Sequence, residues 1–332
     1  MILAIESSCD DSALAITKIA DKTIVFEGKI SQDSSHTEFG GVVPELAARL
    51  HAENLPALLE RAKPYLAGVK AIAVTNEPGL TVTLSEGVVM AQALAIALHK
   101  PILPIHHIKG HLYSLAIGGD LPMPCAALMA SGGHTLILEA ADYSAMREVA
   151  GTLDDAFGEA FDKTAKMLAL GYPGGRAVEE LARKGSAARF DLPVPLKGDA
   201  RLAFSFSGLK NSARLAIAGF GGLAAMSEED RSDLAASFQS AAIAHILDKT
   251  RRYLAAARPK RMGLVGGASA NLALRSAFGE LCAEFGAEPL FAPLEYCSDN
   301  AAMIARAAIE AYRLGDFCDP AEIKIRSRSP LK

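Results

Sequence analysis

Two segments of similar pattern constrain the fold of this chain more than any other feature. Residues 1–5 and 13–19 are short apolar runs on either side of a polar, acidic segment at 6–12. Apolar runs of this length around a polar turn predict a β-hairpin with an acidic tip. Residues 126–138 repeat the pattern around the small polar turn Ser131-Gly132-Gly133-His134. The repetition predicts two lobes of similar plan.

A duplicated strand, turn and strand is shared by actin, sugar kinases and heat-shock chaperone ATPases, in which the two turns hold a nucleotide's phosphates across a cleft. The chain has 332 residues, which is enough for two hydrophobic cores. We therefore expect an α/β protein with the two-lobed, actin-like ATPase fold around a nucleotide cleft. The expected domains are a first lobe at 1–120, a second lobe at 121–298, and a C-terminal helix and tail at 299–332 that return to the first lobe.

Apolar spacing predicts the elements between and after these hairpins. Residues 193–208 are rich in loop-forming residues. The expected strands lie at 69–74 and 261–265, and the expected helices at 44–61, 85–99, 159–170, from 176, 230–257, from 271, and 299–314.

The charge of the chain limits how it can contact nucleic acid. A formal net charge of -4 argues against binding of phosphates by the whole surface, because that needs concentrated Lys and Arg. A local basic patch remains an open alternative, and its clearest candidate is the tail with Lys324, Arg326, Arg328 and Lys332. A solvated terminus is the ordinary explanation for such a run.

The cysteines favour a reducing compartment. The five of them are widely spaced and form no Cys-x-x-Cys pair, so neither a disulfide framework nor a zinc ribbon is indicated. No basic stretch precedes the first apolar run, and no apolar run reaches about 18 uncharged residues. We expect a soluble cytoplasmic protein that does not enter a membrane.

Two histidines have the spacing of metal ligands. His107 and His111 are four residues apart, which on a helix places both imidazoles on one face. Partly buried structural histidines are the commoner explanation of this spacing alone, and His106 is a competing ligand. A thermolysin-type peptidase needs glutamate directly after the first histidine, and Ile108 stands there. Asp299, at the start of the last predicted helix, is a candidate third ligand or simply a helix cap.

Three glycine-rich turns could bring backbone N–H groups against phosphate oxygens, because glycine has no Cβ to obstruct them. They lie at 131–133, 173–175 and 266–269, and the side-chain amide of Asn271 could bond an adenosine. Each is also explained as an ordinary tight turn. The chain has no Walker-type Gly-x-x-x-x-Gly-Lys sequence, which disfavours a P-loop fold.

Taken in order, these segments resemble the tRNA threonylcarbamoyladenosine synthesis family of the bacterial TsaD type, once described as O-sialoglycoprotein endopeptidases. The resemblance extends over nearly the whole chain. Its motifs lie at residues 5–11, 40–45, 106–111, 131–135, 161–166, 172–175, 204–210, 266–271 and 297–300.

The resemblance implies a metal-dependent acyltransferase that needs no protein nucleophile. Its donor would be threonylcarbamoyl adenylate, and its acceptor the exocyclic amine of the adenosine 3′ of the anticodon in tRNAs that read codons beginning with A. It implies one divalent metal, Fe²⁺ with Zn²⁺ as the alternative, and partners of the TsaB and TsaE types. The implied metal ligands are His107, His111 and Asp299, and the implied adenylate-binding residues are Met129, Ala130, Ser131, Gly132, Gly133, Asp162, Gly175, Glu179 and Asn271. We expect the imidazoles from one half of the molecule and the carboxylate from the other.

The chain departs from the family pattern at several positions. Glu77 and Arg176 stand where glycine and proline are common, and Glu179 replaces an aspartate that helps to hold the nucleotide. Residues 81–87 replace a more apolar stretch, and Ser329 replaces a common tryptophan. The rival hypotheses are a non-catalytic nucleotide-binding paralogue, a metallopeptidase and a sugar kinase on the same fold.

Overall fold

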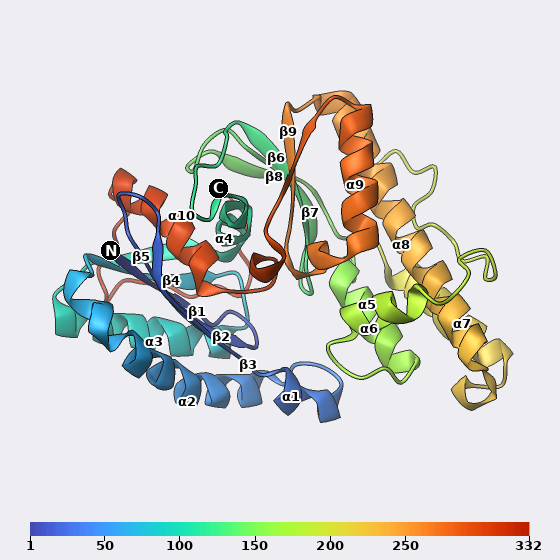
Figure 1. The fold of residues 1–332 in the computed structure, drawn as a ribbon, viewed down its shortest axis with the longest axis horizontal. Helices are drawn as coiled ribbons and strands as arrows, with labels where there is room; N and C mark the ends of the chain where they lie inside the picture. Colours follow the sequence, from blue (N-terminus) through green and yellow to red (C-terminus); the bar gives the residue numbers. More distant parts are fainter. Residues whose placement is uncertain (332) are drawn as a thin grey trace. The chain divides into compact units, whose positions relative to one another are not determined.

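The computed structural model describes residues 1–331, so Lys332 of the basic tail lies outside the described residues. The chain divides into two compact units (Figure 1). Unit 1 comprises residues 1–123, 140–146 and 292–332, and unit 2 comprises residues 124–139 and 147–291. Each unit contains a five-stranded mixed sheet.

The sheet of unit 1 has the order β3-β2-β1-β4-β5. The predicted hairpin is present, because β1 pairs antiparallel with β2 and places Ile5 opposite Leu14. Strands β4 and β5 extend the sheet in parallel with β1. The strands are β1 (Ile2–Glu6), β2 (Asp11–Thr17), β3 (Ile24–Ser31), β4 (Ala71–Glu77) and β5 (Ile102–His106).

Helices cover both faces of this sheet. Leu55 of α2 and Val88 of α3 join Leu3 of β1 in one apolar core, and α10 lies on the opposite face (Figure 1). Burial on both faces explains why β1 is apolar at consecutive positions instead of alternating. The helices are α1 (Asp33–His36), α2 (Pro44–Ala62), α3 (Thr81–Leu98), α4 (His107–Tyr113) and α10 (Ala301–Leu314), with 3₁₀ turns at Thr37–Phe39, Lys63–Gly68, Ser114–Ala116 and Leu294–Tyr296.

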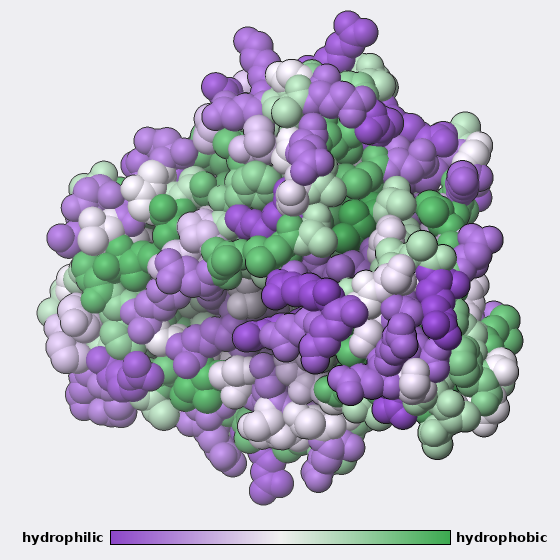
Figure 2. Space-filling view, turned by 45° about the vertical axis from the view of Figure 1, so that its right-hand side comes forward, coloured by the Kyte–Doolittle hydropathy of each residue, from purple (hydrophilic) through white to green (hydrophobic). Residues whose placement is uncertain are grey.

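Helix α3 is long and apolar enough, by length and composition, to cross a membrane. It packs against α2 and β4 and buries Leu84, Val88 and Ala91, so it is a core helix of unit 1. Hydrophilic residues cover much of the molecular face shown in Figure 2. These features are those of a soluble protein.

The sheet of unit 2 has the order β10-β9-β6-β7-β8. Its core contains a cluster of aromatic rings: the ring centroid of Phe161 lies 4.6 Å from that of Phe157 and 5.2 Å from that of Phe238. The strands are β6 (Cys125–Ala130), β7 (Thr135–Ala140), β8 (Met146–Gly151), β9 (Arg261–Val265) and β10 (Glu288–Phe291). The helices are α5 (Phe157–Met167), α6 (Gly174–Ala182), α7 (Ser207–Gly219), α8 (Glu228–Ala257) and α9 (Leu272–Glu284), with 3₁₀ turns at Leu223–Ala225 and Gly267–Ala270.

Several predicted helices have different ends in the structure: the helix expected at 85–99 extends from Thr81 to Leu98. Two of these differences have clear local reasons. The helix expected at 159–170 ends at Met167, because Ala169 has a positive φ of 55° that a helix cannot contain. The helix expected from Asp299 begins at Ala301, because Asn300 is the cap whose side chain accepts a hydrogen bond from the Met303 amide.

Candidate functional site

The two histidines of the candidate metal site are positioned by the junction of β5 and α4. Strand β5 ends at His106 and α4 begins at His107, so His107 and His111 face the same side of the first helical turns. His106 is not a ligand with them: its Nδ1 accepts the Ile108 amide at 3.2 Å as the helix cap. Burial lowers the pKa of His106 to about 4, and the neutral ring suits this role as acceptor.

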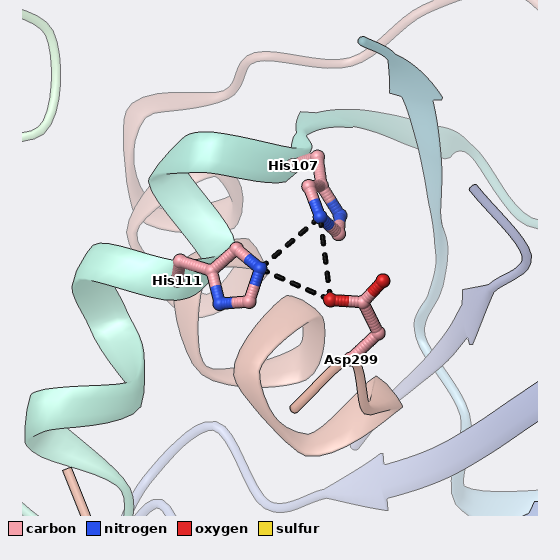
Figure 3. A group of neighbouring side chains, drawn as sticks. All are labelled: His107, His111 and Asp299. Carbon is pink, nitrogen blue, oxygen red and sulfur yellow. Dashed lines mark hydrogen bonds and ion pairs between the residues drawn. The ribbon is translucent and has the colours of Figure 1, made fainter. Parts of the chain in front are cut away.

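The three predicted ligands converge on one point (Figure 3). The Nε2 atoms of His107 and His111 are 3.1 Å apart. Asp299 Oδ1 lies 3.5 Å from Nε2 of His107 and 3.1 Å from Nε2 of His111. Ligands about 2.1 Å from one ion are roughly 3.0–3.4 Å apart at tetrahedral or octahedral angles. The group therefore fits a single divalent metal, and its three ligands do not fill a tetrahedral or octahedral shell.

A second layer of hydrogen bonds orients His107. Its Nδ1 lies 3.1 Å from Oε2 of Glu6, a residue with no exposed surface at the end of β1. Glu6 in turn accepts the Ser8 amide at 2.6 Å and the Thr75 hydroxyl at 2.5 Å. A carboxylate on Nδ1 keeps the proton there and leaves the Nε2 lone pair free for a metal.

The electrostatics of the group favour a positive charge at its centre. Burial alone would lower the pKa of His107, but Asp299 and Glu6 raise it to about 10. Burial would raise the pKa of Asp299, yet His107 holds it well below its usual range. Burial lowers the pKa of His111, whose Nδ1 has no hydrogen-bond partner within residues 1–331. Bound metal would replace the proton of His107 as the positive charge.

Lys29 fixes the turn that carries the carboxylate ligand. Its Nζ donates to the backbone oxygen of Asp299 at 2.9 Å and to Ser298 Oγ at 3.1 Å. The same ammonium lies 2.5 Å from Asp11, and burial of that carboxyl raises its pKa to about 7 even beside Lys29. Strand β3 thus holds the Asp299 turn against the hairpin tip.

All three candidate ligands belong to unit 1. The expectation that the carboxylate comes from the other half was wrong, because the chain returns to unit 1 at residue 292, before Asp299. The alternative that Asp299 is only a cap was also wrong, because Asn300 caps α10. Because Asn300 caps α10, the carboxylate of Asp299 is not used as the cap and can face the two histidines.

The nine residues expected to bind adenylate all lie in unit 2. Met129 and Ala130 have buried side chains in β6. Gly132 and Gly133 form an open turn after β6, and a Cβ added to either would meet nothing within 4 Å. This turn packs on Gly158 of α5, whose amide donates to Ser131 at 3.1 Å.

The other expected residues bond to neighbouring residues of unit 2. Asp162 accepts the Gly174 amide at 2.8 Å, and Gly175 is open. Asn271 caps α9 and donates to Gln239 at 2.8 Å. Glu179 accepts the Leu272 amide at 3.0 Å. The structure thereby joins the start of α9 to α6.

A cavity of about 440 Å³ lies beside these contacts in unit 2. It is bounded by α6, α8 and α9, and Gln239, the partner of Asn271, is part of its wall. Its other walls are mostly small residues such as Ala182, Gly185 and Ala273. Pattern reasoning missed Gln239 and this cavity, because they depend on how three helices pack.

The structure shows which residues are contacted by the side chains or backbone at the positions that depart from the family pattern. Oε2 of Glu77 lies 3.1 Å from Nη1 of Arg326 in the C-terminal tail. Arg176 pairs with Glu180 on the exposed side of α6 at 2.7 Å. Glu179 is also held by Arg183 at 2.8 Å. The backbone oxygen of Ser329 lies 3.4 Å from His106.

Comparison with known proteins identifies the family. A family model described as TsaD, tRNA N6-adenosine threonylcarbamoyltransferase, matches residues 23–306. The tRNA N6-adenosine threonylcarbamoyltransferase of a Nitratiruptor species is 57% identical over 96% of both chains. The enzyme of the same description from Wolinella succinogenes is 55% identical over 99% of both chains.

Solved structures of low sequence identity share the fold. HypF from T. kodakarensis matches with a TM-score of 0.65 at 13% identity, over 98% of this chain and 49% of that chain. Component A of the Acidaminococcus fermentans (R)-2-hydroxyglutaryl-CoA dehydratase matches with a TM-score of 0.55 at 14% identity, over 95% and 97%. The predicted actin-like fold is thereby confirmed. The chain belongs to the TsaD family, the tRNA N6-adenosine threonylcarbamoyltransferases, and is an enzyme of that class.

Proposed function

We propose that the chain transfers the threonylcarbamoyl group of threonylcarbamoyl adenylate to the exocyclic amine of the adenosine 3′ of the anticodon, in tRNAs that read codons beginning with A. The amine nitrogen forms a bond to the carbamoyl carbon while the bond from that carbon to the phosphate oxygen breaks. AMP leaves with the electron pair, and the amine loses a proton. The single observation that carries this proposal, beside family membership, is the group of His107, His111 and Asp299, in which both imidazoles are buried.

The metal held by this group would be Fe²⁺, with Zn²⁺ as the alternative, since both suit two imidazoles and one carboxylate. When bound, it supplies a Lewis acid that polarises the threonylcarbamoyl carbonyl. The chain's own task is orientation, because an aromatic amine is a weak nucleophile. Glu6 and Lys29 hold His107 and the Asp299 turn in place, and the tRNA base must be splayed from its loop to reach them.

The adenylate would be held by residues 129–133, Asp162, Gly175, Glu179 and Asn271 of unit 2. The open turn at Gly132 and Gly133 supports contact of backbone amides with the phosphate. Asn271 caps α9, and Glu179 of α6 accepts the Leu272 amide at the same end of that helix, where a ribose or a base edge can be bonded. The cavity walled by Gln239 has room for the base.

The proposed partners are a TsaB-type actin-like protein and a TsaE-type ATPase, in the cytoplasm. The exposed face of α3 supports a protein partner, because Val82, Val89 and Ile96 form an apolar stripe at helical spacing. The five free cysteines suit a reducing compartment. The lobe boundaries at 1–120, 121–298 and 299–332 stay a prediction.

The test is to replace a bacterial host's own gene with the gene for this chain and to measure tRNA nucleosides by mass spectrometry. We expect threonylcarbamoyladenosine to be restored, and to be lost with Asp299→Ala. Asp21→Ala, which removes an exposed carboxylate of the same unit, should retain it. Modification that survives Asp299→Ala would favour the non-catalytic scaffold, with another protein performing the transfer.

A further inference from the structure

The basic tail noted in the sequence is bonded to the end of β4 and to His106, the residue before the ligand His107. The Ser327 backbone oxygen accepts the Gly79 amide, and the Asn76 side chain donates to the Lys324 backbone oxygen at 2.9 Å. The Arg326 amide donates to Asn76 in return. These bonds fix residues 324–327 along the end of β4.

Only a few hydrogen bonds separate this tail from the ligand His107. The Leu80 amide, next to the Gly79 that bonds the tail, donates to the backbone of Ser8 at 2.9 Å. The hydroxyl of Ser8 lies 3.2 Å from Nδ1 of His107. On the other side, Ser329 contacts His106, the residue before that ligand. The tail is therefore connected to the metal centre through the Gly79–Leu80 turn and Ser8, and through His106.

The tail directs its positive charges outward. Ile323 and Ile325 pack against the core of unit 1. Because side chains alternate in an extended segment, Lys324 and Arg326 are exposed. Arg328 is exposed as well, and within residues 1–331 neither Lys324 nor Arg328 has an ion-pair partner. The run 324–331 contains no acidic residue in a chain whose net charge is -4.

We propose that Lys324, Arg326 and Arg328 bind the phosphodiester backbone of tRNA beside the nucleotide that enters the metal centre. The proposal rests on the proposed function, since a splayed-out adenosine brings its own phosphate and those of its neighbours to the rim of the site. Arginine and lysine at such a rim fix the position of the strand without selecting its sequence. Hydrogen bonds to Asn76 and Gly79 hold the backbone of this segment in place, so its side chains project from a fixed position.

Glu77 allows the proposal to be tested in the opposite direction, because it pairs with Arg326. Its carboxylate lies 3.1 Å from Arg326 and occupies a guanidinium that is still 58% exposed. A phosphate must compete with that carboxylate for Arg326. Removal of the carboxylate should therefore strengthen tRNA binding, whereas loss of the basic side chains should weaken it.

The experiment measures binding of labelled tRNA to the full chain by fluorescence anisotropy over a range of salt concentrations. The triple variant Lys324→Gln, Arg326→Gln, Arg328→Gln should bind on the order of 10-fold more weakly. The slope of its log affinity against log salt concentration should become shallower by about 2, because each lost phosphate contact removes about 0.7. Glu77→Gln should bind more tightly. The matched control Arg251→Gln, Arg258→Gln, Lys260→Gln removes the same charges from exposed positions at the end of α8, and should change binding little.

Transfer kinetics with the reconstituted enzyme separate this proposal from the proposed function. The tail variant should raise KM for tRNA and leave kcat and KM for threonylcarbamoyl adenylate unchanged. Hydrogen exchange at the Gly79 and Arg326 amides verifies that the tail stays pinned. Equal losses in the tail and control variants, or an effect on KM for the adenylate instead of tRNA, would overturn the tail proposal. A wild-type chain that forms no threonylcarbamoyladenosine would instead refute the proposed function, whatever the tail variant binds.

Discussion

At the scale of single residues, the carboxylate of Glu6 orients the metal ligand His107 through its contact with Nδ1. Glu6 has no exposed surface, and its two oxygens bond the His107 ring, the Ser8 amide and the Thr75 hydroxyl. The sequence marks Glu6 only as a polar residue after an apolar run. Its partner Thr75 is on β4 and its partner His107 follows β5, so the role of Glu6 arises from strand neighbours that are far apart along the chain.

Glu6→Gln should lower the metal affinity of the chain about 10- to 100-fold. An amide can donate to Nδ1 of His107, which moves the ring proton to Nε2 and blocks the metal-binding lone pair. Chelator competition measures the affinity, and ¹⁵N NMR of the imidazoles reports the tautomer. Asp21→Asn, at an exposed carboxylate, is the control. An unchanged affinity would show that Glu6 does not orient the ligand.

Buried His245 predicts a loss of stability in acid. Burial lowers its pKa to about 4, and its Nε2 accepts the Ser205 amide at 3.1 Å, which requires the neutral ring. The unfolded chain, with a histidine pKa near 6.5, binds more protons below that pH. The stabilisation is therefore complete above about pH 6.5 and is lost as the pH falls toward 4, by roughly 3 kcal/mol in all.

His245→Gln tests this contribution, because glutamine can accept the Ser205 amide without titrating. Between about pH 7.5 and about pH 5, the wild type should lose roughly 2 kcal/mol more than the variant. Urea unfolding at the two pH values gives both free energies of unfolding. Parallel losses in the two proteins would assign the acid sensitivity to other groups.

At the scale of elements, neighbouring glycines of one turn have different roles. Gly174 begins α6 where it meets α5, and an added Cβ would lie 2.3 Å from Cβ of Ala165 and 2.9 Å from Cα of Asp162. Gly175 follows it and faces open space. Both belong to one predicted glycine-rich turn, and only helix packing distinguishes them.

Gly174→Ala should therefore destabilise the chain by about 1–3 kcal/mol through overpacking. Gly175→Ala serves as the matched control, and should be neutral or more stable by up to about 1 kcal/mol, since alanine favours a helix. The free energy of unfolding in urea decides between them. Similar values for the two variants would contradict the close approach of α6 to α5.

At the scale of the whole molecule, unit 1 is assembled from distant parts of the chain. Its sheet is complete by residue 106, yet α10 covers one face of that sheet and the consecutive residues 301–309 of α10 are all buried. A chain that ends at residue 291 should leave this face bare. Unit 1 of that fragment should then be protease-sensitive and bind no metal.

Limited proteolysis and metal binding measure this outcome. A chain that ends at Ile325 keeps α10 and the packed residues Ile323 and Ile325, so it should resist protease and bind metal. A resistant fragment spanning residues 1–123 of the shorter chain would show that unit 1 does not need its C-terminal segment.

The sequence by itself determined the features that depend on neighbours along the chain. Apolar runs around polar turns indicated the two hairpins, helical spacing placed His107 and His111 on one face, and ordered motifs indicated the family. These follow from strand and helix periodicity, which is local. The tertiary structure alone decided that Asp299 reaches the histidines within unit 1, that Glu6 orients His107, that Lys29 holds the Asp299 turn, and that the tail contacts His106. Those contacts join residues far apart in sequence, and only the packing of the sheet with its helices brings them together.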